Sequence, residues 1–344
     1  MFGKIAFLGS GETSLAGGRI FESLVKDLDH APKIAIMETT AGFELNSPLV
    51  AQKVGDYLSK RLQNYVPQIH IIPARKRGTE FSPDNPAILA PLLSADLIFM
   101  GPGSPTYAVR QLKNSLAWDI IRARHRRGTA LVFASAATIA ISAHTLPVYE
   151  IFKVGEDIHF KEGLDLFKDF GLPLSFIPHW NNAEGGADLD TSRCFVGRER
   201  FDIWRAQLPP NQTIIGLDEH TGIILDFETQ KCRISGVSSV TICDGKETKI
   251  YPAGEEFNLA ELGTLKTPDA DEGISNAAFE FLRNAPEPEL DSLPPTEVQQ
   301  LAESRQKARA NKDFAKSDQL RDQINALGWD LRDTSNGQEL VKKD

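Results

Sequence analysis

Residues 129–138 read TALVFASAAT, and this stretch decides the fold of the chain. Its apolar run, residues 130–134, is followed directly by Ser135 and then by a segment with helical character. A strand that is apolar at every position is buried on both faces, as in a parallel sheet covered by helices. A side chain that follows such a strand lies at the carboxyl edge of the sheet, where α/β proteins hold their chemistry. The stretch therefore predicts an α/β fold with Ser135 at its functional edge.

The surrounding sequence extends this strand into a sheet. Four earlier apolar runs, at residues 4–8, 33–37, 69–72 and 97–100, alternate with segments of helical spacing. Alternating βα units imply right-handed crossovers and a doubly wound, mostly parallel sheet. The later elements are expected to be a strand at 174–177, a helix at 192–208, a strand at 213–217 and hairpins at 222–234 and 240–251. We expect these hairpins to close one edge of the sheet.

Composition excludes several classes of protein. With 344 residues, 41% of them hydrophobic, the chain is long enough for a large domain and an appendage. Its net charge of −9 argues against a chain-wide footprint for nucleic acid. The three cysteines lack metal-binding spacing and are interpreted as free thiols of a cytoplasmic protein. The first apolar run is too short for a signal peptide or a membrane span, so no membrane partner is expected.

Three regions are distinguished along the chain. Residues 1–263 carry the α/β pattern, and residues 264–295 are rich in proline and acidic residues, with one short helix expected at 275–283. We interpret the second region as a linker. Residues 296–344 form a helical domain, because residues 297–326 have strong helical character and Gly328 provides a glycine stop.

Three segments that follow predicted strands contain candidate catalytic groups. Ser135 lies at a strand-to-helix turn, Gly101-Pro102-Gly103-Ser104 follows the fourth strand, and His179 ends the strand near residue 177. A serine becomes a nucleophile when a base takes its proton and a third group orients the base. The amides of Ala136 and of the glycine-rich turn are suited to hold an oxyanion. By contrast, Gly9-Ser10-Gly11 lacks the rest of a nucleotide-binding fingerprint and is interpreted as a tight turn.

The order of these motifs resembles the cyanophycinase and aspartyl dipeptidase (peptidase E-like) family of serine hydrolases, which have a class I glutamine amidotransferase-like fold. The similarity runs from about residue 3 to residue 250. The matching segments are Gly101–Ser104, Ala134–Thr138, Glu150, Pro178–Trp180 and Gly216–Thr221.

This resemblance implies an amide or peptide hydrolase with Ser135 as nucleophile, His179 as general base and Glu150 as the orienting carboxylate. Gly103 and Ala136 would then be the oxyanion donors. Two positions depart from the family pattern: Ala137 replaces a family glycine, and Ser104 replaces a family amide side chain. The residues expected to bind substrate are Ser104, Asn182, Arg198 and Arg200.

The resemblance implies no metal or organic cofactor and a small peptide or amide as substrate. A homodimer is the oligomer favoured in this class, because exposed sheet edges pair. A non-catalytic binding protein stays open as the alternative function. An amidotransferase with a cysteine nucleophile is disfavoured, because position 135 is serine.

The tail resembles the C-terminal helical module of cysteinyl-tRNA synthetases. The matching residues are Arg305, Ala308, Arg309, Lys312, Asp313, Phe314, Ala315, Ser317, Asp318, Leu320, Arg321 and Asp322. The resemblance implies contact with tRNA, through Arg305, Arg309, Lys312 and Arg321. The alternative is a solvated helix face, since acidic residues offset the basic ones. Leu301, Ala308, Phe314, Ala315, Leu320 and Ile324 are expected to form the apolar seam of a helical hairpin.

Overall fold

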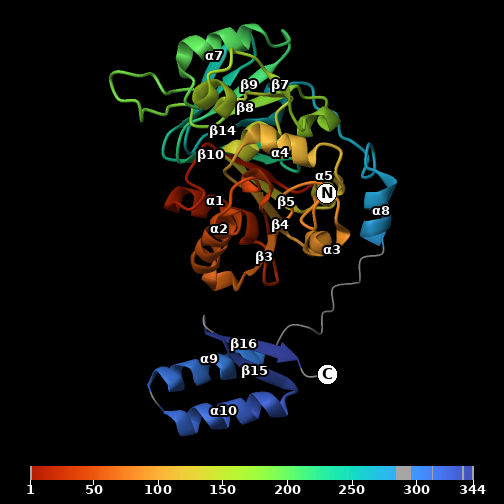
Figure 1. The fold of residues 1–344 in the computed structure, drawn as a ribbon, viewed down its shortest axis with the longest axis vertical. Coiled ribbons are helices and arrows are strands. Elements are labelled where there is room, and N and C mark those ends of the chain that lie inside the picture. The colour runs from red at the N-terminus through yellow and green to blue at the C-terminus, as the bar shows by residue number, and fades with distance from the viewer. Residues whose placement is uncertain (1, 246, 284–295, 312, 335–336, 343–344) are drawn as a thin grey trace. The chain divides into compact units, whose positions relative to one another are not determined.

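The computed structural model describes residues 2–245, 247–283, 296–311, 313–334 and 337–342 (Figure 1). It divides into two compact units, residues 1–285 and 286–344, each of which is treated by itself. The boundary falls within residues 264–295, the segment that the sequence assigned to a linker. Residues 264–283 therefore belong to the larger unit, and the rest of the expected linker lies outside the described residues.

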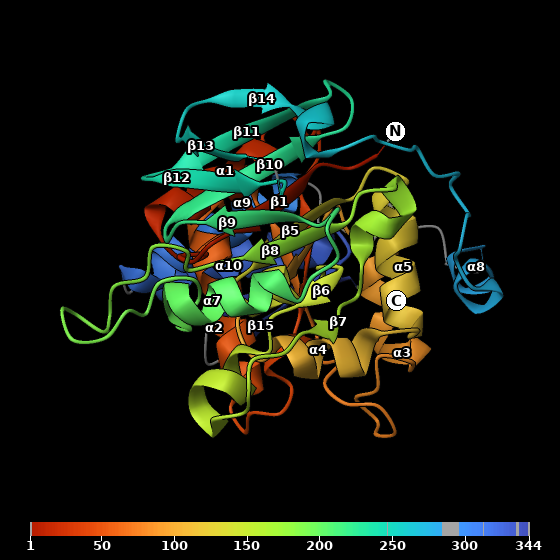
Figure 2. The same cartoon turned by 90° about the horizontal axis from the view of Figure 1, so that it is seen from above.

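The larger unit is built on an eight-stranded sheet (Figure 2). Its strands run in the order β14 (Glu256–Asn258), β11 (Lys231–Gly236), β10 (Thr221–Asp226), β1 (Ile5–Leu8), β5 (Ala130–Ala134), β4 (Leu97–Met100), β2 (Lys33–Met37) and β3 (Gln68–Ile72). The five strands from β1 to β3 are parallel, and β10, β11 and β14 are antiparallel. The predicted α/β fold with a mostly parallel sheet is confirmed.

Helices cover both faces of this sheet, as the apolar strands require. On β1, Ala6 and Leu8 share a buried cluster with residues of α1 (Leu15–Val25) and α2 (Ser47–Arg61). Ile5 and Phe7, which point the other way, lie in a second cluster with α4 (Pro105–Leu112) and α5 (Leu116–His125). Successive side chains of a strand face opposite sides, so a doubly covered strand must be apolar throughout.

A second, four-stranded sheet packs into the same unit. Its order is β13 (Thr248–Pro252), β12 (Ser239–Cys243), β9 (Thr213–Leu217) and β8 (Leu174–Ile177). The β12–β13 hairpin therefore extends this second sheet. The β10–β11 hairpin is added to the main sheet beside β1, as expected, and β14 is the outermost strand there.

The remaining elements of the larger unit are short or peripheral. They are η1 (Thr39–Ala41), η2 (Gln63–Tyr65), α3 (Pro86–Leu89), η3 (Ala90–Leu93), α6 (Ala136–Ala140), β6 (His144–Thr145), the π-helix η4 (Glu150–Val154), β7 (Lys161–Glu162), η5 (Leu166–Phe170), α7 (Gly197–Ala206), η6 (Leu259–Leu262) and α8 (Asn276–Arg283). Helix α7 begins later than the predicted residue 192, because Arg193, Cys194 and Phe195 have positive φ and cannot be helical.

The proline-rich segment before α8 is tied to the core by arginines of α5 and its end. Arg122 donates to the carbonyl of Gly273 at 2.9 Å, and Arg126 donates to the carbonyl of Glu272 at 2.6 Å. Ile274 belongs to the main hydrophobic cluster, and α8 packs beside α5 (Figure 2). This segment is thus part of the folded unit, because backbone carbonyls and buried apolar side chains anchor it.

The smaller unit contains α9 (Thr296–Ala310), α10 (Phe314–Ala326), β15 (Trp329–Thr334) and β16 (Gly337–Lys342). The expected helical hairpin is present, and a β-hairpin that the sequence did not predict packs against α10. The hydrophobic core of the smaller unit is formed by Val298, Ala302, Ile324, Trp329 and Leu331. Phe314 is 62% exposed and Ala315 is also exposed, so neither belongs to the predicted seam.

Among the described residues, no helix is long and apolar enough to cross a membrane.

His125, at the end of α5, provides a test of this packing through pH. Its Nε2 lies 2.9 Å from the carbonyl of Gly3, and its ring is fully buried against Phe2, Phe170 and Phe227. Burial lowers the pKa of His125 from 6.5 to about 4. The unfolded chain therefore takes up the proton first, and stability falls as pH decreases from 6.5 to 4.

We predict that this histidine removes about 3 kcal/mol of stability across that window, at about 1.4 kcal/mol per unit of pKa difference. Urea unfolding, followed by tryptophan fluorescence between pH 7 and 4, measures it. His125→Phe keeps a ring in the aromatic cluster but does not titrate, so it should lose about 3 kcal/mol less than the unsubstituted chain over the window. Parallel stability curves for the two chains would contradict the prediction.

Candidate active site

The end of β1 joins two other strand ends by backbone hydrogen bonds. The amide of Ser135, after β5, donates to the carbonyl of Leu8 at 3.2 Å, and the amide of His179, after β8, donates to the carbonyl of Gly9 at 3.2 Å. Gly9 is required here, because a Cβ on it would lie 2.2 Å from the carbonyl oxygen of Asp218. The serine and the histidine are therefore fixed by consecutive carbonyls of one strand end.

Ser135 occupies a strained backbone conformation. Its φ of 52° and ψ of −117° lie outside the regions that residues with a Cβ favour. This turn reverses the chain between β5 and α6 and is typical of a nucleophile held above a sheet edge. The Oγ of Ser135 lies 3.0 Å from Nε2 of His179. Ala137, which replaces a family glycine, is fully buried in the main hydrophobic cluster.

The other nitrogen of His179 faces a carboxylate. Its Nδ1 lies 2.9 Å from Oε1 of Glu219, two residues after β9. A carboxylate accepts hydrogen bonds, so Nδ1 carries the proton and Nε2 is left to accept from the hydroxyl of Ser135. Asn182 also donates to Glu219 Oε1, at 2.9 Å, and the Glu219 amide donates to Oδ1 of Asn181 at 2.8 Å.

These contacts keep Glu219 ionised. Burial by itself raises the pKa of this carboxyl, but the hydrogen bonds from Asn182 and His179, together with the electrostatic attraction of His179 and His220, outweigh burial. The net pKa of Glu219 is therefore below the ordinary glutamate value. Ser135, His179 and Glu219 thus form a continuous hydrogen-bonded chain that ends on a stable negative charge.

The expectation that Glu150 orients His179 is not met by the structure. Glu150 begins the π-helix η4, and its Oε1 accepts from Lys161 at 3.3 Å. No contact joins it to His179 among the described residues. Glu219 lies in the segment Gly216–Thr221, which resembles the family, but the resemblance gave this residue no role. Its position after a strand was a signal that could have identified it.

The glycine-rich turn after β4 lies against η1. The amide of Ser104 donates to the carbonyl of Thr40 at 2.9 Å, and a Cβ on Gly103, whose φ is 142°, would lie 2.0 Å from that carbonyl oxygen. The hydroxyl of Ser104 is buried, lies 3.1 Å from the hydroxyl of Thr106 and accepts from the amide of Tyr107, so it caps α4. Within the described parts of the chain, the amides of Gly103 and Ala136 have no hydrogen-bond acceptor.

The other expected substrate-binding residues lie elsewhere or are already engaged. Asn182 is 3% exposed and supports Glu219. Arg198 and Arg200 are exposed on α7, and neither contacts Ser135, His179 or Glu219 in the described structure. The sequence alone could not have placed these arginines, because a surface helix near a site in sequence need not face it.

The expected RNA-binding residues also differ in accessibility. Arg305 is 1% exposed, so its side chain is part of the interior of the smaller unit. Arg321 donates to the carbonyl of Leu331 at 3.1 Å and so ties α10 to β15. Arg309 is exposed, and Lys312 lies outside the described residues.

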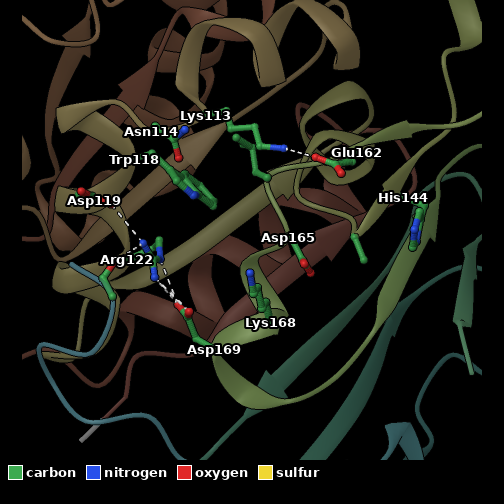
Figure 3. A pocket seen from close by; sticks show the side chains of 14 residues that line it. Lys113, Asn114, Trp118, Asp119, Arg122, His144, Glu162, Asp165, Lys168 and Asp169 are labelled. Carbon is green, nitrogen blue, oxygen red and sulfur yellow. Dashed lines mark hydrogen bonds and ion pairs between the residues drawn. The ribbon is translucent and has the colours of Figure 1, made fainter. Parts of the chain in front are cut away.

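A separate polar pocket of about 500 Å3 is shown in Figure 3. Its wall includes the ion pairs of Lys113 with Glu162, at 2.7 Å, and of Arg122 with Asp169, at 2.8 Å. Most of its charges therefore compensate one another. Ser135, His179 and Glu219 are not among its lining residues.

Reactive thiols and metal clusters are absent from the described residues. Cys194, Cys232 and Cys243 are buried and unpaired, and burial raises the pKa of both Cys194 and Cys232. No group of three or more histidine, cysteine, aspartate or glutamate residues is arranged to hold a metal in the described chain.

The C-terminal residues are similar in sequence to known proteins. Residues 291–340 match the family described as the cysteinyl-tRNA ligase anticodon binding domain. The chain is 50% identical over 54 residues to a cysteine–tRNA ligase of Streptococcus equi subsp. zooepidemicus, which covers 16% of this chain and 12% of that protein. It is 60% identical over 47 residues to the cysteine–tRNA ligase of Latilactobacillus sakei, covering 14% and 10%. The chain thus spans about a tenth of the length of these curated relatives.

Comparison with solved structures concerns the fold. The chain resembles the crystal structure of a peptidase from an acI-B1 actinobacterium, with a TM-score of 0.60 and 23% identity over 75% of this chain and 97% of that one. At this identity the likeness establishes a common fold. The chain therefore combines the fold of a solved peptidase with a C-terminal segment that matches the cysteinyl-tRNA ligase anticodon-binding family.

Proposed function

We propose that the larger unit is a serine-type hydrolase of peptide or amide bonds, with Ser135, His179 and Glu219 as its catalytic residues. The observation that carries the proposal is the hydrogen-bonded chain from the Ser135 hydroxyl through both nitrogens of His179 to the Glu219 carboxylate. A base that accepts the hydroxyl proton, and a carboxylate that orients and charges the base, make a serine nucleophilic. The strained turn at Ser135 and the fold shared with a peptidase support the same reading.

The reaction follows from these positions. Oγ of Ser135 attacks the substrate carbonyl carbon while Nε2 of His179 takes the hydroxyl proton, and Glu219 stabilises the imidazolium that forms. The amides of Gly103 and Ala136 donate to the oxyanion of the tetrahedral intermediate. His179 then passes its proton to the leaving nitrogen, and the C–N bond breaks to leave an ester on Ser135. Water, activated by His179, hydrolyses this ester.

The resemblance to cyanophycinases and aspartyl dipeptidases supports a small peptide or amide as the substrate. The resemblance rests on the order of motifs along the chain. Three of these motifs contribute to the site, namely Ser135, His179 and the segment Gly216–Thr221. The proposed chemistry uses side chains, backbone amides and water, and it requires no cofactor.

The first prediction concerns an activated serine. A fluorophosphonate probe should label the purified chain, and Ser135→Ala should abolish labelling because the acceptor oxygen is gone. His179→Ala should slow labelling by about 10³-fold or more, since the hydroxyl loses its base. Gel fluorescence and intact mass measure both. A well-folded chain that the probe does not label would favour the alternative, a non-catalytic binding protein.

The second prediction separates two glutamates. Glu219→Gln preserves the size of the side chain but removes the charge beside His179, so labelling should slow by about 10²-fold or more. Glu150→Gln is the matched control, because its carboxylate contacts Lys161 instead, and its labelling rate should equal that of the unsubstituted chain. Equal rates for all three chains would exclude Glu219 from the catalytic group. A loss confined to Glu150→Gln would restore the assignment made from sequence.

A second function is favoured for the tail by its match to an anticodon-binding family. We propose that the smaller unit binds tRNA. Arg305 is buried and Arg321 is bound to a backbone carbonyl, so the contacts are assigned instead to exposed basic residues. Arg309 was expected from sequence, and Lys307 and Lys316 join it.

We predict that Lys307→Ala combined with Lys316→Ala weakens tRNA binding and lowers the slope of log affinity against log salt by about 1 to 2, because each lost phosphate contact removes roughly one released counterion. Fluorescence anisotropy with labelled bulk tRNA at several salt concentrations measures both quantities. Asp318→Asn is the opposite-sign control: it removes an exposed negative charge and should strengthen binding. If none of the three substitutions changes the affinity for tRNA, the proposal that these exposed basic residues bind RNA is wrong.

A further inference from the structure

The turn before α7 adopts an unusual conformation. Arg193, Cys194 and Phe195 have φ values of 56°, 60° and 70°, so three consecutive residues with a Cβ are left-handed. Single left-handed residues occur in turns, but a run of three is strongly disfavoured. Such a conformation persists only where the surrounding structure imposes it, and it is concentrated near functional sites.

The turn is held onto the segment that carries His179. The amide of Cys194 donates to the carbonyl of His179 at 3.1 Å, and the amide of Arg193 donates to the carbonyl of Trp180 at 3.0 Å. The guanidinium of Arg193 lies 3.7 Å from the centre of the Trp180 ring and donates to the same carbonyl at 2.8 Å. These bonds fix the position of Phe195, the last residue of the turn.

Phe195 lies beside the catalytic imidazole. Its ring centre is 5.4 Å from that of His179 and 5.8 Å from that of Phe152, a residue of η4. The ammonium of Lys153 lies 4.8 Å from the Phe152 ring centre. Both phenylalanine rings are only partly buried. Two partly exposed rings, Phe195 and then Phe152, therefore follow one another from His179, and we call this pair the aromatic wall.

The chemistry of the site decides which part of a substrate meets this wall. His179 must deliver a proton to the leaving nitrogen, so the leaving group is on the histidine side of Ser135. We propose that the aromatic wall is a subsite for the leaving amine and selects an apolar side chain on it. The inference rests on the serine hydrolase proposed above and names the class of its leaving group.

A glycine leaving group would leave the rings of this wall uncovered. An acidic side chain gains nothing from the rings themselves, although the Lys153 ammonium beside Phe152 offers it an ion-pair partner. We therefore expect phenylalanine, leucine and methionine as leaving residues to be favoured over glycine.

The experiment uses the full chain and an equimolar library of dipeptides, with products quantified by mass spectrometry. Ser135→Ala defines the background. The unsubstituted chain should release apolar second residues with kcat/KM about tenfold or more above that for glycine, as expected for an apolar pocket. Phe195→Ala should remove this preference, and Phe195→Leu should restore most of it. Phe160→Ala, which removes a ring from the same hydrophobic region but contacts His144, is the matched control and should keep the preference.

Fluorophosphonate labelling separates this inference from the function on which it rests, because the leaving group of the probe is a small fluoride. Phe195→Ala should be labelled at nearly the rate of the unsubstituted chain. If labelling slows as much as peptide release does, Phe195 positions His179 and the subsite is refuted. Normal labelling without an apolar preference, or without any dipeptide cleavage, would also refute the subsite while the activated serine stands. Absence of labelling would instead refute the hydrolase.

Discussion

The carbonyl groups at the end of β1 are the constraint on which the site depends. Leu8 accepts from the amide of Ser135 and Gly9 accepts from the amide of His179, so one strand end sets the separation of hydroxyl and imidazole. The third strand end, β9, approaches so closely that only glycine fits at position 9. Side-chain geometry at this edge is therefore inherited from backbone hydrogen bonding between strands, which is the most rigid part of an α/β protein.

The same constraint explains how far the sequence could predict the site. Apolar runs identify strands, and Ser135 and His179 were found because each directly follows one. Glu219 follows β9 in the same way, but the resemblance directed attention to Glu150, which follows no strand. The rule that chemistry gathers at carboxyl strand ends points to Glu219, whose carboxylate contacts His179, whereas the order of acidic residues along the chain pointed to Glu150.

Other differences arose where local patterns carry little information. The segment before α8 has the proline and charge content of a linker, yet its backbone carbonyls satisfy Arg122 and Arg126. Arginines usually lie at the surface, so Arg305 was interpreted as a solvent-facing contact, although it is buried in the smaller unit. In the β15–β16 hairpin, Trp329 and Leu331 alternate with Asp330 and Arg332, but this alternation covers only two apolar residues, so neither strand stood out from sequence. In each case tertiary contacts overrode the local pattern.

The three buried cysteines give the chain a practical property. Cys194, Cys232 and Cys243 are each at most 4% exposed, and Cys194 and Cys232 are further held in the unreactive thiol form. Maleimide dyes react with exposed thiolates, so the native protein presents little background to them. One cysteine introduced on each unit would then accept a fluorophore pair without prior removal of the natural ones. The distance between the larger unit and the tRNA ligase-like tail becomes measurable by energy transfer in the otherwise unaltered chain.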